Sequence, residues 1–342
     1  MSVLEKLDVI PGLVSVLTKT LFAFVFGPFK SRKSRPKSYY RYVMLTAMRT
    51  TMARLNVRQQ HYISTPGDDV YLALCKKHKL TPQSEILEDG TRAHWIGEKG
   101  KEAENLIINF HDVGKAGKER LLPLPILRSR THSPVSETTT ASFLANESRL
   151  AQPIILTGDS AGANLVMALL SHITHPHPGL GGIQIPKVEF EGSFKGVVLT
   201  SPWVSFEVTS DSFQENEPKD VVSISAGKKW STSFLGTPWP HATAVDAYNQ
   251  PAGNAVPVSW FEDFPKIVDE VLIVCGSDEV MVDGIRDFKK KLAKGMGEDR
   301  VKFFVGENEY HDQPSLDLGI GYKESEEGMQ AKEIKRWIAS KL

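Results

Sequence analysis

The chain has 342 residues, enough for one large α/β domain with a smaller appendage. Its 41 Lys and Arg residues balance its 41 Asp and Glu residues, so the charge favours a neutral or apolar ligand over nucleic acid. Cys75 and Cys275 lie far apart in the sequence, which argues against a disulfide framework and predicts packed thiols.

The amino-terminal stretch 9–29 is largely apolar, and a run of Lys and Arg follows at 30–37. Three interpretations are open: a lid helix that dips into a membrane surface, a membrane-spanning helix, or a lid helix of a soluble enzyme. Pro11, Gly12 and Lys19 argue against a span, and the acidic residues near the start argue against a cleaved signal peptide. Residues 9–37 are therefore a candidate contact with a membrane surface. The location of the protein stays open between cytoplasmic and membrane-associated.

The rest of the chain alternates apolar runs with helical patterns. Strands are expected at 84–87 and 92–96, paired across Asp89-Gly90, and at 106–110, 154–157, 196–200, 271–274 and 301–305. Helices are expected at 40–54, 70–79, 164–172, 283–292 and 327–338. Apolar strands separated by helices predict a mostly parallel sheet covered on both faces. We expect an amino-terminal and cap segment at 1–60, and a core at 61–342 with a cap insertion at about 206–265.

The pentapeptide Gly158-Asp159-Ser160-Ala161-Gly162 lies between an expected strand and an expected helix. A serine on such a sharp turn has neighbours two positions away that press against adjoining backbone, so glycines at 158 and 162 fit the turn. Ser160 is therefore the candidate nucleophile. The alternative is an ordinary helix start capped by Asp159 or Ser160.

A nucleophilic serine needs a base to accept its proton and an acid to orient that base. Asp278 follows the expected strand 271–274, and His311 follows the expected strand 301–305. The chain order serine, acid, histidine is the order that α/β-hydrolase folds use. Asp278 is the candidate acid, with Glu279 and Asp283 as competitors, and His311 is the candidate base.

Several segments together carry a family resemblance: Phe110-His111, Gly158-Asp159-Ser160-Ala161-Gly162-Ala163-Asn164-Leu165, Ser201-Pro202-Trp203, Gly276-Ser277-Asp278-Glu279-Val280 and Tyr310-His311-Asp312-Gln313-Pro314. The chain from about residue 40 onward resembles the hormone-sensitive-lipase-like esterases, in particular their fungal members. The resemblance implies an α/β-hydrolase fold with a helical cap, and carboxylic-ester hydrolysis without a cofactor or metal. It assigns one backbone N–H of the oxyanion hole to Ala161. Candidates for the substrate pocket are His111, Trp203 and Trp260.

The chain departs from the family at the oxyanion loop. The family has His-Gly-Gly-Gly, whereas this chain has His111-Asp112-Val113-Gly114, so the expected hole is formed by Val113, Gly114 and Ala161. Val113 resists the backbone conformations that glycine adopts, and losing a hole donor costs about a hundredfold to a thousandfold in rate. A hydrolase fold with impaired catalysis is therefore an alternative to an active esterase.

The interval between His111 and Ser160 is short for the expected helix, strand and helix. Its composition includes a proline-interrupted apolar patch at 121–127 and a Ser/Thr-rich stretch at 129–142, which is typical of loops. Our hypothesis is that a strand and its helix are missing from 115–150, through a gene-model error or a real deletion. The sheet would then be truncated beside the active site.

Two weaker patterns favour structural over functional interpretations. Gly114-Lys115-Ala116-Gly117-Lys118 lacks the spacing of a phosphate loop, and His172, His175 and His177 fit a solvated helix end better than a metal site. Two functions remain: a serine hydrolase of an apolar ester, lactone or thioester, or an impaired hydrolase fold that binds an apolar small molecule or a partner. A non-hydrolytic biosynthetic role of the same site also stays open.

Overall fold

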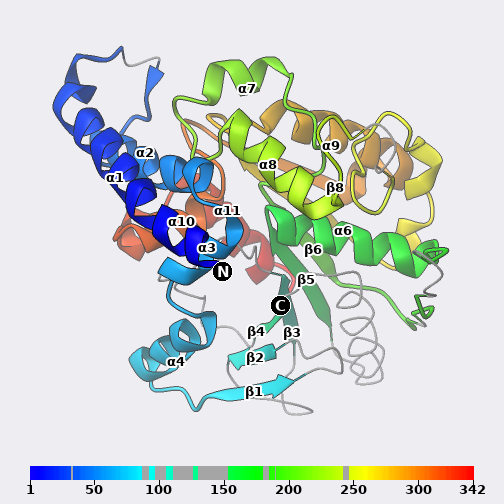
Figure 1. Ribbon diagram of the computed structural model, residues 1–342. Coiled ribbons are helices and arrows are strands. Elements are labelled where there is room, and N and C mark those ends of the chain that lie inside the picture. The colour runs from blue at the N-terminus through cyan, green and yellow to red at the C-terminus, as the bar shows by residue number, and fades with distance from the viewer. Residues whose placement is uncertain are drawn as a thin grey trace.

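A computed structural model describes residues 1–31, 34–86, 92–96, 105–110, 126–129, 153–179, 185–188, 190–241 and 246–342. The strands of these ranges form one eight-stranded sheet in the order β1-β2-β4-β3-β5-β6-β7-β8 (Figure 1). The six strands β3 to β8 run parallel, and β1 and β2 add an antiparallel edge. The strands are β1 (Gln83–Ile86), β2 (Arg92–Ile96), β3 (Leu106–Phe110), β4 (Ile126–Ser129), β5 (Ile154–Asp159), β6 (Gly196–Thr200), β7 (Val271–Gly276) and β8 (Val301–Gly306).

The hypothesis of a missing strand is wrong. Residues Ile126–Ser129 form β4, which pairs with β2 on one side and with β3 on the other, so the sheet is continuous. The strand begins directly after Pro125, as expected because proline lacks the N–H that a strand interior needs. The expected missing helix concerns residues outside the described ranges.

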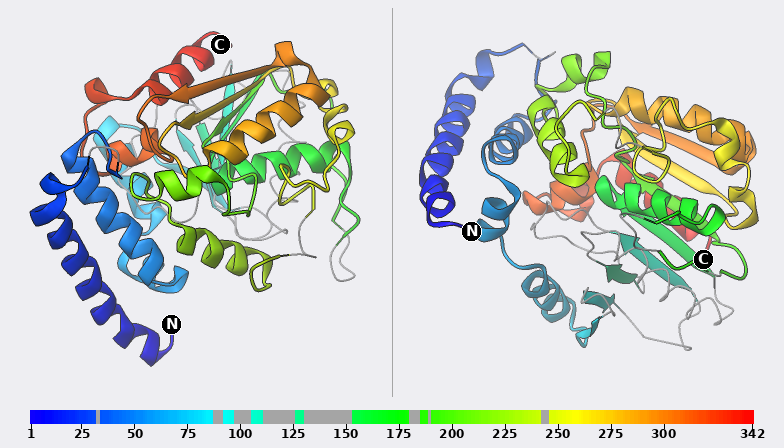
Figure 2. Two further views of the ribbon diagram at one scale, coloured as in Figure 1. Left: turned by 90° about the horizontal axis from the view of Figure 1, so that it is seen from above. Right: turned by 45° about the vertical axis from the view of Figure 1, so that its right-hand side comes forward.

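Side chains alternate between the two faces of the central strands and form two cores. In β5, Ile154 and Leu156 belong to one core and Ile155 to the other, and β6 and β7 follow the same alternation. The first core lies under α6 (Ala161–Thr174) and α9 (Val282–Met296). The second lies under α4 (Gly67–His78) and α11 (Met329–Ala339). This arrangement confirms the predicted parallel sheet with helices on both faces (Figure 2).

The other helices gather beside the sheet and above its carboxyl edge (Figures 1 and 2). They are α1 (Val3–Phe26), α2 (Tyr39–Arg54), α3 (Val57–Ile63), α7 (Asp211–Asn216), α8 (Ile224–Leu235) and α10 (Gln313–Gly319), with short 3-10 turns at η1 (Gly27–Phe29), η3 (Val258–Phe261), η4 (Phe264–Lys266), η5 (Glu298–Arg300) and η6 (Glu324–Glu326). Helix α1 packs along α2, and α2 contacts α8 of the insertion. The carboxyl edge is where ligands bind in open α/β sheets.

Helix α1 begins earlier than the apolar pattern predicts. Ser2 and Glu5 form a reciprocal capping box, which starts the helix at Val3. The segment Val3–Phe29 is long and apolar enough to cross a membrane, and its most apolar 18-residue stretch has a mean hydropathy of 1.9. Only 17% of its most apolar stretch is buried against the rest of the protein.

Candidate active site

Ser160 lies on the turn between β5 and α6, with φ 54° and ψ −115°. This left-handed conformation is unfavourable for a residue with a side chain, and the surrounding backbone holds it. The Ser160 N–H donates to the Thr200 carbonyl, and the Ser160 carbonyl accepts from Trp203 N–H. A Cβ at Gly158 would lie 2.6 Å from the Gly162 carbonyl oxygen, so glycine at 158 allows the close return of the helix.

His311 meets Ser160 across the carboxyl edge of the sheet. The loop after β8 carries the imidazole, whose Nε2 lies 2.8 Å from Ser160 Oγ. Both side chains are buried, with 4% of Ser160 and 2% of His311 exposed. This distance allows the hydroxyl proton to pass directly to the ring.

The carboxylate at the other ring nitrogen is Glu279. Its Oε2 lies 3.4 Å from His311 Nδ1, whereas the predicted acid, Asp278, pairs with Lys219 Nζ at 3.2 Å. The structure therefore differs from the prediction, because Glu279 and not Asp278 faces the His311 ring. The reason is the tight turn after β7, in which Gly276 N–H donates to Glu279 Oε1 at 2.6 Å and folds this side chain inward.

Ser201 links the loop of the acid to the loop of the base. Its hydroxyl donates to Glu279 Oε1 at 2.5 Å and accepts the N–H of Asp312 at 3.0 Å. Ser160, Ser201 and Asp312 all have positive φ values, of 54°, 45° and 52°. Backbone strain is thus concentrated where the reactive groups meet, as expected for a site held by its surroundings.

Two more carboxylates lie close to His311. Asp312 Oδ2 is 3.4 Å from Nε2. Asp220 is fully buried: its Oδ1 accepts the His311 N–H at 3.0 Å, and its Oδ2 accepts the Val280 N–H at 2.7 Å. Asp220 therefore holds the backbone of the loop that carries His311 and of the turn that carries Glu279 with one side chain.

Charge determines the pKa of His311. Burial by itself lowers it, but the negative charges of Asp312, Glu279 and Asp220 outweigh burial and raise the pKa to about 9. Burial raises the pKa of Asp220 to about 6, with nearby Glu279 acting in the same direction and His311 opposing it. With Nδ1 facing a carboxylate, the neutral ring carries its proton there and leaves Nε2 free to accept the Ser160 proton.

The insertion supports Asp220 from outside the site. Arg49 of α2 donates through Nη1 to the carbonyls of Glu217 and Asp220, at 2.7 and 2.6 Å. Asn216 donates to the carbonyls of Ser277 and Glu279, at 3.1 and 2.8 Å. Sequence reasoning missed Asp220 because no motif surrounds it, and because His311 and Val280, whose N–H groups it accepts, are distant in the chain. The only signal was its position in the insertion that follows Ser201-Pro202-Trp203.

The remaining predicted site residues divide into three groups. Ala161 and Gly162 open α6, and Trp203 is buried, with its backbone N–H donating to the Ser160 carbonyl. Trp260 lies elsewhere: it stacks on His175, and its Nε1 donates to Ser171 near the end of α6, roughly 16 Å from Ser160 along the helix. The predicted residues His111, Val113 and Gly114 lie outside the described residues.

The three histidine rings at and after the end of α6 do not converge on one point, although the His177 N–H donates to His172 Nδ1 at 2.9 Å. His172 Nε2 lies 2.9 Å from the Pro186 carbonyl, His175 stacks on Trp260, and the His177 ring packs against Tyr248. Over the part of the chain that the structure describes, no group of three His, Cys, Asp or Glu residues has metal-binding geometry.

A family model for the alpha/beta hydrolase fold matches residues 135–314, which is more than half of the chain. A comparison with curated protein sequences finds no match.

Solved structures are similar in fold. Carboxyl esterase 2 from the mycorrhizal fungus Tuber melanosporum is 17% identical with a TM-score of 0.53, covering 76% of this chain and 85% of that one. The Francisella virulence factor BioJ is 17% identical with a TM-score of 0.57, covering 84% and 94%. An esterase from the bacterial hormone-sensitive lipase family is 17% identical with a TM-score of 0.55, covering 88% and 96%. The family model, the sheet order and the serine turn agree, and the chain belongs to the α/β-hydrolase family.

Proposed function

We propose that this protein is a serine hydrolase of carboxylic esters, with Ser160 as nucleophile, His311 as base and Glu279 as acid. The observation that carries the proposal is the 2.8 Å contact between Ser160 Oγ and His311 Nε2, with Glu279 at the opposite ring nitrogen. This arrangement supplies the proton acceptor that a serine hydroxyl needs once the pH is high enough to leave the His311 ring neutral, and the pKa of that ring is about 9.

The reaction would proceed in two halves. Ser160 Oγ attacks the ester carbonyl carbon while its proton moves to His311 Nε2, and the imidazolium returns that proton to the leaving alcohol. Water then loses a proton to His311, attacks the acyl-serine and releases the carboxylic acid and free Ser160. Glu279 stabilises the imidazolium, and Ala161 N–H, at the first position of α6, is the proposed donor to the oxyanion.

We propose an apolar acyl group as part of the substrate: an ester, a lactone or a thioester. Support comes from an aromatic cluster around Trp203, whose backbone N–H binds the Ser160 carbonyl. The Trp203 ring centre lies 4.9 Å from that of Phe206 and 6.5 Å from that of Trp230. Residues 9–37 are the proposed contact with a membrane surface, from which an apolar substrate would arrive.

Labelling the purified protein with a fluorophosphonate tests the proposal. We expect one covalent adduct, mapped to Ser160 by mass spectrometry, and turnover of short p-nitrophenyl esters. Ser160→Ala should abolish both, whereas Ser233→Ala, an exposed serine on α8, should leave both unchanged. Apolar-ligand binding without an adduct would instead favour an impaired hydrolase fold, which the sequence Asp112-Val113 at the oxyanion loop makes a specific alternative.

A further inference from the structure

Helix α1 has its small and polar side chains toward the protein and its large apolar side chains toward the outside. The residues buried against the protein are Val9, Gly12 and Ala23, with Gly27 of η1 after them. A helix that faces water has the opposite arrangement, with its large apolar side chains in the core. The outer face of α1 therefore suits an apolar medium.

Polar contacts hold α1 on the protein at its amino-terminal end. Asp8 pairs with Arg54 of α2 through two hydrogen bonds, at 2.5 and 2.9 Å. Gln59 of α3 donates to Asp8 at 3.0 Å and to the Glu5 carbonyl at 2.9 Å. At the other end, the Tyr39 hydroxyl donates to the Phe24 carbonyl. Both ends of α1 are thus attached to the helices below.

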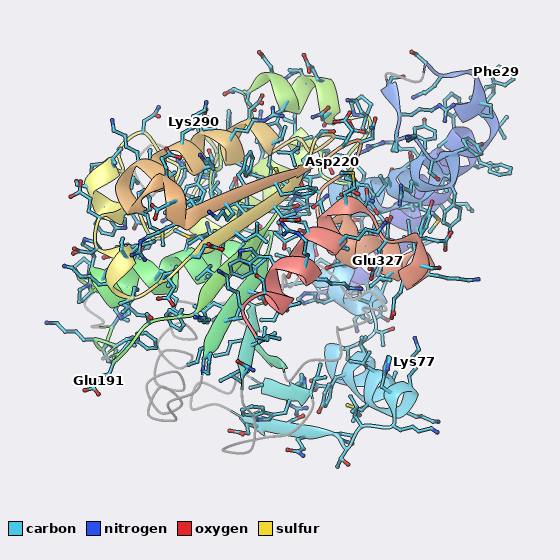
Figure 3. All side chains as sticks on the ribbon, turned by 180° about the vertical axis from the view of Figure 1, so that it is seen from behind. Phe29, Lys77, Glu191, Asp220, Lys290 and Glu327 are labelled. Atoms are coloured by element: carbon cyan, nitrogen blue, oxygen red, sulfur yellow. The ribbon has the colours of Figure 1, made fainter. Side chains whose placement is uncertain are left out.

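The outer face is apolar along its whole length. A stripe at three- and four-residue spacing consists of Val3, Leu7, Ile10, Val14, Leu17, Leu21 and Phe24, with exposed fractions from 57% to 75%. Leu4, Leu13, Phe22, Val25 and Phe26 widen the stripe on both sides, and Phe29 of η1, at 86% exposed, projects from the tip (Figure 3). An exposed apolar surface of this kind marks an interaction site.

Charges are sorted between the two sides of α1. Its acidic residues, Glu5 and Asp8, are bound to the protein side through Asn56, Gln59 and Arg54. Its lysines, Lys6 and Lys19, are exposed, and Lys30 and Lys37 are exposed beyond its carboxyl end. A cationic rim around an apolar face complements an anionic lipid surface.

The stripe has the spacing of a coiled-coil seam, so a second copy of the chain is the main competing occupant. A coiled coil has a narrow seam flanked by charged residues that pair across the interface. Here the flanking positions are Leu4, Lys6, Leu13, Thr18, Thr20 and Val25, of which only Lys6 is charged, and Pro11 interrupts one flank. The width of the apolar surface, with one lysine and no acidic partner for it at the flanks, fits acyl chains and headgroups better than a partner helix.

A membrane span is also disfavoured, because α2 accompanies α1 along its length. Helix α2 carries Arg41 and Arg49, which bind partners of the folded body, and Arg54, which pairs with Asp8 of α1. A spanning α1 would either bring these guanidinium groups into the hydrocarbon or break the Asp8–Arg54 pair.

We infer that the outer face of α1 and η1 binds an anionic phospholipid leaflet in the plane of the membrane, while α1 stays packed on α2. The inference rests on the membrane contact of the proposed function and specifies its orientation and lipid class. Helix α2 would then connect this surface to the active site, because Arg49 binds the backbone of Asp220.

Vesicle flotation of the purified full-length protein tests the inference. Vesicles of phosphatidylcholine with phosphatidylserine should bind the protein, and pure phosphatidylcholine vesicles should bind it on the order of tenfold more weakly. Phe22→Gln with Phe26→Gln should weaken binding on the order of a hundredfold, and Lys30→Gln with Lys37→Gln should remove the preference for phosphatidylserine. The matched control, Leu72→Gln with Lys77→Gln on exposed positions of α4, should bind like the unmodified protein.

Two further measurements separate the other occupants. Membranes from cells that express the chain should release it in alkaline carbonate; retention would indicate a span and overturn the inference. A dimer that forms without lipid is the second test. If Val14→Gln dissociates this dimer and Phe22→Gln with Phe26→Gln preserves it, the outer face of α1 binds a second copy of the chain, and the inference is overturned. Fluorophosphonate labelling of Ser160 in every variant reports the fold and the nucleophile, so failure of vesicle binding and failure of the hydrolase proposal are distinguishable.

Discussion

Three carboxylates surround His311, and their charge determines the pH at which the ring can act as a base. Glu279 faces Nδ1, Asp312 faces Nε2, and Asp220 binds the backbone N–H of the same residue. The pKa of about 9 means that the ring keeps its proton through neutral pH, although burial opposes this. A protonated ring cannot accept the proton of Ser160, so the high pKa limits the base while it favours the imidazolium formed during the reaction.

The pH dependence of kcat/KM follows from this charge balance. We expect kcat/KM for a p-nitrophenyl ester to rise with pH, with the midpoint of the rise at about 9, because the fraction of neutral His311 rises through its pKa. Asp312→Asn removes the charge that is the largest single cause raising this pKa, so the rise should move roughly one unit toward neutral pH. Asp287→Asn, an exposed carboxylate on α9, should not move it. A wild-type rise centred near the ordinary histidine pKa would contradict the expected charge effect.

The choice between Glu279 and Asp278 as the acid can be tested by exchanging each for its amide. Glu279→Gln should lower kcat by about 10⁴, because the amide no longer stabilises the imidazolium or enforces the reactive tautomer. Asp278→Asn should change kcat by less than about threefold, because this residue pairs with Lys219 instead of His311. The kcat values of both variants, with fluorophosphonate labelling rates, provide the measurement. Equal losses in the two would contradict the assignment.

The site was predictable to the extent that local chain geometry determines it. Ser160 could be found because its pentapeptide, strand and helix are contiguous in sequence, and His311 because it follows a recognisable strand. Glu279 was assigned second rank because the direction of a side chain in the turn after β7 depends on the hydrogen bond to Gly276, which sequence does not display. Asp220 was missed because its partners, Val280 and His311, are distant in the chain.

At the scale of elements, the segment between α7 and α8 connects the catalytic loops. Asp220 accepts hydrogen bonds from Val280 N–H, beside the acid, and from His311 N–H. A buried carboxylate is expensive to hold in place, and three backbone donors, including Val221 N–H at 2.7 Å, make this one favourable. The insertion therefore positions the acid and the base relative to each other, and does more than cover the site.

Removing the Asp220 carboxylate tests this positioning role. Asp220→Ala should lower the free energy of unfolding by about 3 kcal/mol, because buried N–H groups lose their acceptor. The labelling rate of Ser160 should fall at least about tenfold, since the base is no longer held against the hydroxyl. Urea denaturation and timed labelling measure the two effects, with Asp287→Ala as the exposed control. Loss of stability with an unchanged labelling rate would reduce Asp220 to a structural residue.

The elements themselves were largely predictable because most strands are continuous apolar runs bounded by polar segments. The expected strands at 106–110 and 196–200 match β3 and β6, and the amphipathic pattern at 283–292 lies within α9. Strand β4 was overlooked because its four residues follow a proline-interrupted patch and precede a Ser/Thr-rich stretch. A short strand stabilised by two neighbours needs little signal of its own, since pairing on both sides supplies its stability.

For the molecule as a whole, α2 is the connection between the amino-terminal layer and the body. Helix α1 packs on the outer side of α2, and Arg49 of α2 donates a hydrogen bond to the Glu217 carbonyl of the insertion. Helix α2 also reaches the carboxyl-terminal part, where Arg41 pairs with Asp317 of α10 through hydrogen bonds of 3.0 and 2.6 Å. None of these contacts was predictable from the helical pattern at 40–54, because each depends on a partner brought close only by the complete fold.

Breaking the Arg41–Asp317 pair tests whether α2 holds the molecule together. The Asp317 side chain is 5% exposed, and it also accepts a hydrogen bond from the Tyr310 hydroxyl at 2.8 Å. Tyr310 directly precedes His311 in the chain. Arg41→Ala would leave this carboxylate without its cation, so we expect the free energy of unfolding to fall by about 3 kcal/mol.

The matched control is Arg336→Ala, whose pair with Glu333 has an arginine that is 72% exposed and should contribute less than about 1 kcal/mol. Urea denaturation of both variants measures the difference. Because Tyr310 leads directly into the catalytic loop, Arg41→Ala should also slow the labelling of Ser160, whereas Arg336→Ala should not. Equal unfolding free energies in the two variants would show that α2 packs on the body without stabilising it, and would separate the amino-terminal layer from the active site.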